Sequence, residues 1–204
     1  KKLDVEHRVY SFKKLYGHTI DEIAEAAKEK GNPFICSYCG ILRRKALNIA
    51  ARELGAAKLA TAHNLDDEVQ SMVMNLLRGD LTRMSKNEFD SGKDDGSLIP
   101  RVKPLCEIPE REAALYAFLK KIKLQSFPCS YLETSLRSDV RRFLNMMDEK
   151  HPGMKFTIYR SFAKIQLHLT YSEERSLTRC GVCGEPTTSE ICMACQTLKD
   201  LNLT

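Results

Sequence analysis

Four cysteines near the C-terminus constrain the fold of this chain more than any other feature. They form two C-x-x-C pairs that lie eight residues apart: Cys180, Cys183, Cys192 and Cys195. Two such tight turns can place four thiolates around one ion, in the tetrahedral arrangement that Zn²⁺ favours in structural sites. The spacing therefore predicts a small zinc ribbon at residues 173–204.

A second group of cysteines indicates a metal site of a different kind. Cys36 and Cys39 form another C-x-x-C pair at the start of an expected helix, and Cys129 is a distant third. Three thiolates leave one coordination position open to chemistry, as in a [4Fe-4S] cluster that has one iron without a protein ligand. The residues alone leave two alternatives open: a closed zinc centre with Cys106 as the fourth ligand, and buried free thiols.

Cysteine usage also bears on the compartment. Eight cysteines among 204 residues could form disulfides in a secreted protein, but the sequence has no apolar signal segment and no stretch long enough to cross a bilayer. We therefore expect a reducing compartment, the cytoplasm, and thiols that bind metal. The formal net charge of +5 is mild, so binding to nucleic acid requires that the basic residues cluster.

The pattern along the chain is typical of an α/β fold with a parallel sheet and flanking helices. Strands are expected at residues 5–12, 58–62 and 124–127, and helices at 19–30, 36–54, 64–77, 110–121 and 136–150. A long loop is expected between Gly79 and Leu98, where the periodicity is lost. Residues 1–172 are thus predicted to form one main domain, and residues 173–204 the ribbon.

Two adjacent carboxylates lie where an open parallel sheet binds its ligands. Asp66 and Asp67 follow the expected strand 58–62 and begin the next helix, beyond the carboxyl end of the strand. Such a pair can hold Mg²⁺ together with substrate phosphates. The alternative is that both are ordinary first-turn acids that complement the helix dipole.

Three cations follow the first cysteine pair. Arg43, Arg44 and Lys45 lie in the first turns of the same expected helix, where they oppose its dipole. Departures from local preference mark candidate functional sites, and cations here could balance a negative cluster or attract phosphate. The alternative is a solvated basic face.

The motifs together resemble those of the cytoplasmic tRNA 2-thiolation enzymes of archaea and eukaryotes, in the TtuA group of N-type ATP pyrophosphatases. The segments that carry the resemblance cover nearly the whole chain: residues 36–40 (CSYCG) with 43–44, 63–70 (HNLDDEVQ), 75–80, 100–105, 108–110, 128–129, 151–153 and the ribbon. Their combination is specific, whereas no single one of them is.

The resemblance implies a Rossmann-like ATP pyrophosphatase domain at residues 1–172. It implies that Mg-ATP adenylates a tRNA uridine at C2 and that sulfur then replaces the activated oxygen. A [4Fe-4S] cluster on Cys36, Cys39 and Cys129 would carry the incoming sulfide on its open iron. Asp67 would act on the ATP and Mg²⁺ side, while the backbone of Ala62 and the side chain of Arg43 would contact the nucleotide.

The partners expected from the resemblance are tRNA, a sulfur donor and a second copy of the protein. The donor would be sulfide, a persulfide or a ubiquitin-like carrier with a thiocarboxylate end. The tRNA surface would use basic residues, mostly as phosphate contacts: Arg78, Arg101, Lys103, Arg137, Arg141 and Arg142.

The family's pyrophosphate loop, Ser-Gly-Gly-x-Asp-Ser, and its N-terminal zinc knuckle do not occur in residues 1–204. Both are expected to precede Lys1, so the main domain is expected to be N-terminally incomplete here. The missing loop supports a rival interpretation, a non-catalytic zinc-ribbon protein that binds RNA or acts as a scaffold. A third, an enzyme that thiolates cytidine or modifies another base, is disfavoured by the ribbon.

Overall fold

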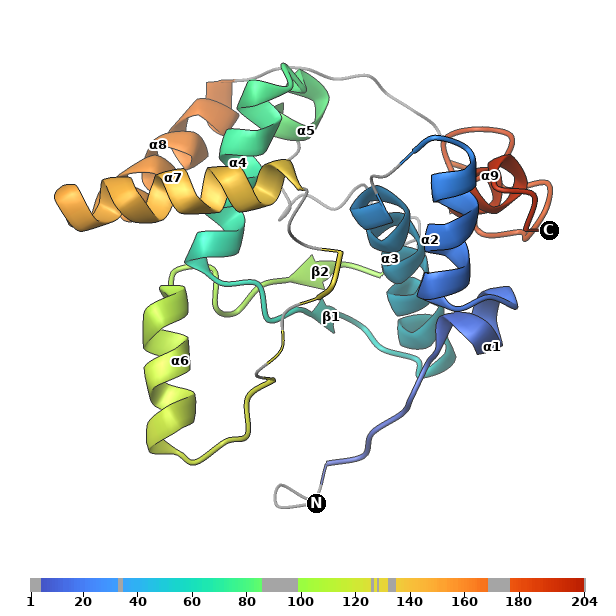
Figure 1. The fold of residues 1–204 in the computed structure, drawn as a ribbon, viewed down its shortest axis with the longest axis horizontal. Coiled ribbons are helices and arrows are strands. Elements are labelled where there is room, and N and C mark those ends of the chain that lie inside the picture. Colours follow the sequence, from blue (N-terminus) through green and yellow to red (C-terminus); the bar gives the residue numbers. More distant parts are fainter. Residues whose placement is uncertain are drawn as a thin grey trace. The chain divides into compact units, whose positions relative to one another are not determined.

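The computed structural model describes residues 5–32, 35–85, 99–125, 127, 129–131, 135–168 and 177–203. The contacts between residues group the chain into two units (Figure 1). The first unit consists of Lys1–Ala57 together with Ser176–Thr204, and the second of Lys58–Arg175. These units group residues by contact and do not test which segments fold independently. The expected main domain at residues 1–172 and the expected ribbon at residues 173–204 therefore stay predictions.

The first unit joins three N-terminal helices to the cysteine-rich ribbon. Its elements are α1 (Phe12–Tyr16), α2 (Ile20–Glu29), α3 (Ile35–Glu53), β3 (Thr178–Arg179), β4 (Pro186–Thr187) and α9 (Met193–Asp200). Strands β3 and β4 pair antiparallel. Thr19 and Glu22 form the capping box that begins α2, because each side chain satisfies a backbone amide that the first helical turn leaves unpaired.

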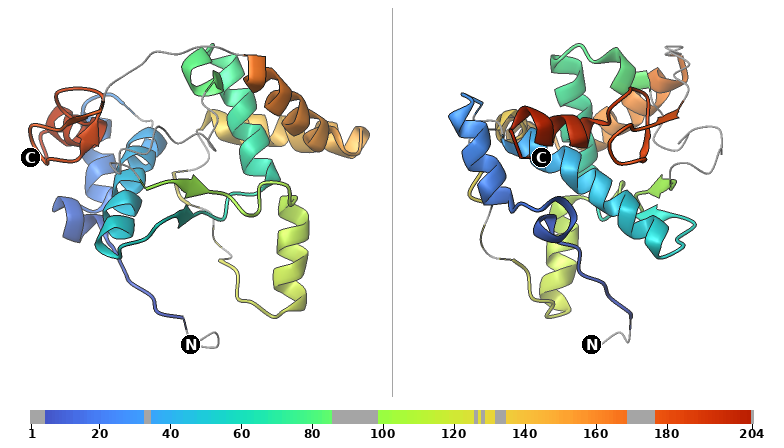
Figure 2. Two further views of the ribbon diagram at one scale, coloured as in Figure 1. Left: turned by 180° about the vertical axis from the view of Figure 1, so that it is seen from behind. Right: turned by 90° about the vertical axis from the view of Figure 1, so that its right-hand side faces the viewer.

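The ribbon packs against α3 through α9 (Figure 2). At this contact Arg52 of α3 donates two hydrogen bonds to the carboxylate of Glu185, at 2.7 and 2.9 Å. Lys30 donates to the carbonyl of Asp200, and His18 Nε2 lies 3.0 Å from the carbonyl oxygen of Leu203. Residues far apart in the sequence therefore form one packed unit.

The second unit contains the parallel strands and the remaining helices. Its elements are β1 (Leu59–Ala60), α4 (Leu65–Leu77), α5 (Leu81–Ser85), β2 (Arg101–Val102), α6 (Glu110–Leu119), α7 (Leu136–Lys150) and α8 (Met154–His168). Strands β1 and β2 pair in parallel, with Leu59 opposite Arg101. The α/β fold with a small parallel sheet is thus confirmed.

Helices α4, α7 and α8 enclose the core of this unit (Figure 1). Leu65 and Val69 of α4 are fully buried against Val140 and Leu144 of α7, and Phe156 is among the α8 residues that cover them. These positions repeat at the spacing that places apolar residues on one face of a helix.

Several expectations about local structure were wrong. Residues 5–11 form no strand, and Val5 and Val9 are exposed, because none of the strands among the described residues pairs with this segment. The described residues of 124–127 form no strand either. Leu81–Ser85 is a helix inside the expected loop, whereas residues 86–98 of that loop lie outside the described residues. None of the described helices is both long and apolar enough to cross a membrane.

Candidate functional site

The four ribbon cysteines form a site that fits one metal ion. Their sulfur atoms all lie within 4.8 Å of one another, and the sulfurs of Cys183 and Cys192 are 3.8 Å apart. A tetrahedral zinc ion with Zn–S bonds of about 2.3 Å requires sulfurs about 3.8 Å apart. Cys180, Cys192 and Cys195 are buried, while Cys183 is exposed. A metal ion could therefore bind after a shift of less than about 1 Å in the sulfur positions.

Backbone amides shape this site. The amide of Cys192 donates to the sulfur of Cys180 at 3.2 Å, and the sulfur of Cys192 caps α9 by accepting from the amide of Cys195. Burial opposes ionisation of Cys180, but the amides of Cys192, Cys183 and Val182 outweigh it and lower its pKa to about 6. Burial and the neighbouring sulfurs raise the pKa of Cys195 to about 12. A bound cation would favour the thiolate form of Cys195, which this raised pKa otherwise opposes.

Lys45 of α3 reaches the same sulfurs. Its Nζ lies 3.1 Å from Cys183, 3.4 Å from Cys195 and 3.7 Å from Cys192. Burial disfavours its charged form, but the hydrogen bond to Cys183 and the negative sulfurs prevail and raise its pKa. The sequence marked Lys45 only as one of three cations near the first cysteine pair, and nothing local linked it to the ribbon.

The cysteines predicted to hold the iron–sulfur cluster come from both units. Cys36 and Cys39 lie in the first turns of α3, three residues apart and therefore on one helix face. Cys36 is exposed and Cys39 is half-buried, and the exposed Cys129 belongs to the second unit. Thiolates are the ligands that an iron–sulfur cluster requires. That all three bind the same cluster stays a prediction.

Asp66 and Asp67, which were treated as a pair in the sequence, differ in the structure. The Asp66 side chain is 6% exposed and is paired with Lys155 of α8. Its other oxygen accepts from the amide of Glu110 at 2.7 Å, at the start of α6. Lys155 also donates to Asn145 of α7. The Asp66–Lys155 pair thus joins α4, α6, α7 and α8, and of the two acids only Asp67 is open to an external ligand.

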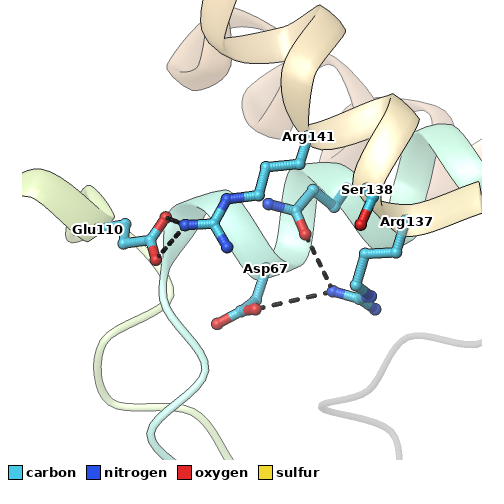
Figure 3. Close-up of a pocket in the computed structure, with 6 residues that line it drawn as sticks. Asp67, Glu110, Arg137, Ser138 and Arg141 are labelled. Atoms are coloured by element: carbon cyan, nitrogen blue, oxygen red, sulfur yellow. Dashed lines mark hydrogen bonds and ion pairs between the residues drawn. The ribbon is translucent and has the colours of Figure 1, made fainter. Parts of the chain in front are cut away.

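Asp67 lines a pocket of about 210 Å³ (Figure 3). It is the N3 residue of a capping box, in which its Oδ2 accepts from the amide of Asn64 at 3.1 Å. Its Oδ1 lies 3.7 Å from Nη1 of Arg137, and its side chain is 35% exposed. The helix start therefore holds the carboxylate in place while it remains open to the pocket.

Two arginines of α7 complete this pocket (Figure 3). Arg137 donates to Gln70 at 3.2 Å and to Ser71 at 3.1 Å, and Arg141 forms two hydrogen bonds with Glu110 at 2.7 and 2.8 Å. The spacing of four residues places both guanidiniums on one side of α7. The pocket therefore combines acids that could hold a cation with guanidiniums that could bind phosphate.

The other predicted site residues lie at different depths. Lys103 is paired with Glu68 at 2.8 Å, and each of these side chains is 12% exposed. A contact of Lys103 with phosphate would thus require it to leave Glu68. Four further predicted residues belong to the second unit, and their roles stay predictions: Ala62 is exposed after β1, Arg78 is exposed at the end of α4, Arg101 is half-buried in β2, and Arg142 is exposed and paired with Asp139.

Arg43 is exposed on α3, in the first unit. His63 follows β1, and its Nδ1 lies 2.9 Å from the hydroxyl of Thr61. Burial, and secondly the charge of Lys103, lower the pKa of His63, which favours the neutral ring. For Arg43, a contact with ATP stays a prediction.

Comparison with known proteins finds relatives that are named as tRNA 2-thiolation proteins. No protein-family model matches it. It is 35% identical to the tRNA 2-thiolation protein NcsA of Haloferax volcanii, over 98% of this chain and 64% of that protein. It is 36% identical to a probable sulfurtransferase of Methanocaldococcus jannaschii, over 97% and 58%. It is 34% identical to cytoplasmic tRNA 2-thiolation protein 1 of Oryza sativa, over 96% and 52%.

A solved structure agrees with these relatives. The U34-tRNA thiolase NcsA from Methanococcus maripaludis, determined with its [4Fe-4S] cluster, matches with a TM-score of 0.78 and 32% identity. The match covers 98% of this chain and 62% of that one. The chain thus spans between half and two thirds of the length of these relatives. It belongs to the tRNA 2-thiolation protein family.

Proposed function

We propose that this protein is a cytoplasmic tRNA-uridine 2-sulfurtransferase that depends on ATP and on a [4Fe-4S] cluster. The observation that carries the proposal is the likeness, in sequence and fold, to a U34-tRNA thiolase that contains this cluster. The names of the eukaryotic relatives support the cytoplasmic location. The same likeness disfavours a non-catalytic scaffold.

The proposed substrate is uridine 34 of tRNA, after the name of the solved relative. The C2 oxygen of uridine is a poor leaving group, and adenylation by ATP, which releases pyrophosphate, converts it into a good one. Sulfur then bonds to C2 as the bond to the adenylated oxygen breaks and AMP leaves. When bound, the cluster supplies an iron without a protein ligand, at which sulfide can be held.

The residues of this chain have separate tasks in the proposed reaction. Cys36, Cys39 and Cys129 hold the cluster, and the four ribbon cysteines hold a structural zinc ion. Asp67 binds Mg²⁺ on the ATP phosphates, since its carboxylate is fixed at a helix start and open to the pocket.

The remaining contacts involve the nucleotide and the partners. Ala62 and Arg43 contact the nucleotide. The sulfur donor is sulfide, a persulfide or a thiocarboxylate carrier, and the active form is a homodimer.

The metal content tests this assignment. Protein reconstituted without oxygen is expected to bind about four irons per chain, with zinc held separately by the ribbon. Cys129→Ser should lose the iron and the brown colour, whereas Cys106→Ser should keep both. The measurement is iron and zinc analysis together with the absorption spectrum. Loss of iron in the Cys106 variant would contradict an open cluster and favour a closed centre with four cysteine ligands.

The arginines of α7 are proposed to bind tRNA phosphates. Changing both Arg137 and Arg141 to alanine should weaken tRNA binding to a similar extent for all sequences and lower the salt slope by about one to two units. The fold should survive, because exposed ion pairs contribute about 0 to 1 kcal/mol each. The measurement is the tRNA dissociation constant at several salt concentrations.

A matched control removes two charges elsewhere in the same unit. Lys120 and Lys123 are exposed at the end of α6 and beyond it, so the Lys120→Ala, Lys123→Ala variant should keep the wild-type salt slope. If the arginine variant also kept the wild-type affinity and salt slope, α7 would not be part of the tRNA surface.

A further inference from the structure

The ammonium group of Lys45 covers one side of the ribbon cysteines. It lies within hydrogen-bonding distance of three of the four sulfurs, and it is closest to Cys183, the exposed member of the set. The Lys45 side chain is half-buried, and its Nζ lies 6.0 Å from the centre of the Tyr16 ring. Lys45 therefore caps the face of the sulfur tetrahedron formed by Cys183, Cys192 and Cys195.

The charge of the metal centre gives this contact a physical role. A divalent ion with four thiolates carries two negative charges in excess, and a partly buried negative charge is costly unless a cation or hydrogen bonds compensate it. An ammonium group supplies both, because it is a point charge with three N–H donors. Two arginines of the same unit donate hydrogen bonds to other groups: Arg52 donates to the carboxylate of Glu185, and Arg179 donates to the carbonyl of Gly184.

The same contact joins the metal centre to α3. Lys45 and Arg52 lie seven residues apart, and therefore on one face of the helix, and both contact the ribbon. Helix α3 also carries Cys36 and Cys39, nine and six residues before Lys45. A change in the charge at the ribbon would thus act directly on the helix that presents these two cysteines.

We propose that Lys45 is the outer-sphere partner of the ribbon metal ion and that its contact with the sulfurs couples metal loading of the ribbon to the packing of α3. Coupling of this kind is reciprocal: if the metal ion stabilises the packed helix, the packed helix stabilises the bound metal ion by the same factor. The proposal rests on the zinc site of the proposed function and is independent of tRNA thiolation.

The first test is zinc transfer from the 204-residue chain to a chromogenic chelator. Removing an outer-sphere partner typically lowers metal affinity about 10- to 100-fold, so Lys45→Met should release zinc to the chelator at correspondingly lower chelator concentrations. Lys45→Arg keeps the charge and the N–H donors and should retain zinc nearly as well as wild type. Lys28→Met, which removes an exposed lysine from α2, is the matched control and should behave as wild type.

The second test is hydrogen exchange of α3. Removing zinc from the wild-type chain should speed exchange of the buried amides around Leu42, Ala46 and Ala51. In Lys45→Met the loaded and zinc-free forms should differ less. Wild-type zinc retention by Lys45→Met, or α3 protection that does not respond to zinc removal, would overturn the proposal. A wild-type chain that binds no zinc would instead contradict the zinc assignment itself.

Discussion

In the full-length protein, Asp67→Asn is expected to lower the rate of ATP-dependent tRNA thiolation by about 100-fold or more and to change tRNA affinity little. A metal ion contributes several kcal/mol of charge stabilisation in such reactions, and each 1.4 kcal/mol corresponds to about tenfold in rate. Asparagine keeps an oxygen that can accept from the amide of Asn64, so the capping box at the start of α4 can still form. The measurement is thiolated tRNA formed at saturating ATP.

The control for this variant is Asp139→Asn, which removes an exposed carboxylate that pairs with Arg142 on α7. It should thiolate tRNA at the wild-type rate. Wild-type turnover by Asp67→Asn would mean that Asp67 serves only as a helix cap.

Lys155→Met is expected to lower the free energy of unfolding by about 3 to 5 kcal/mol, because it leaves the buried carboxylate of Asp66 without its cation. The Asp66 side chain is 6% exposed and that of Lys155 is 12% exposed, so water can replace little of the lost interaction. Denaturant unfolding followed by circular dichroism gives the free energy.

Two further variants distinguish the effect of breaking the Asp66–Lys155 ion pair from the effect of removing any lysine. Lys150→Met removes an exposed lysine from the last turn of α7 and should change stability by less than about 0.5 kcal/mol. Adding Asp66→Asn to Lys155→Met removes the unpaired charge and should recover part of the loss. A Lys155→Met variant within about 1 kcal/mol of wild type would show that the pair contributes little to the fold.

Local patterns were sufficient to predict several elements. Helix α7 has the bounds expected from its apolar periodicity, Leu136–Lys150, and α3 differs from the expected range by one residue at each end. The capping box of Thr19 is where the sequence placed it, since both of its partners lie within four residues. The ribbon cysteines come together for the same reason, because their spacing alone limits how they can fold.

Contacts between distant segments could not be predicted in this way. Asp66 and Asp67 are neighbours in the sequence, and the buried structural acid is distinguished from the open one by contacts with Glu110 and Lys155, 44 and 89 residues after Asp66. Lys45 lies 138 residues before Cys183 and has no local signal that links it to the ribbon. Helix α8 was missed altogether, although Phe156 and Phe162 pack its inner face.

Mass spectrometry of nucleosides from treated tRNA tests the central proposal most directly. The full-length, cluster-loaded protein is incubated without oxygen with unmodified tRNA, Mg-ATP and sulfide. We expect 2-thiouridine at position 34 in the complete mixture, and none when ATP is omitted or when Cys129→Ser replaces the wild-type protein. Absence of 2-thiouridine with protein that holds its full iron and zinc, or its formation by the Cys129 variant without iron, would contradict the proposed function.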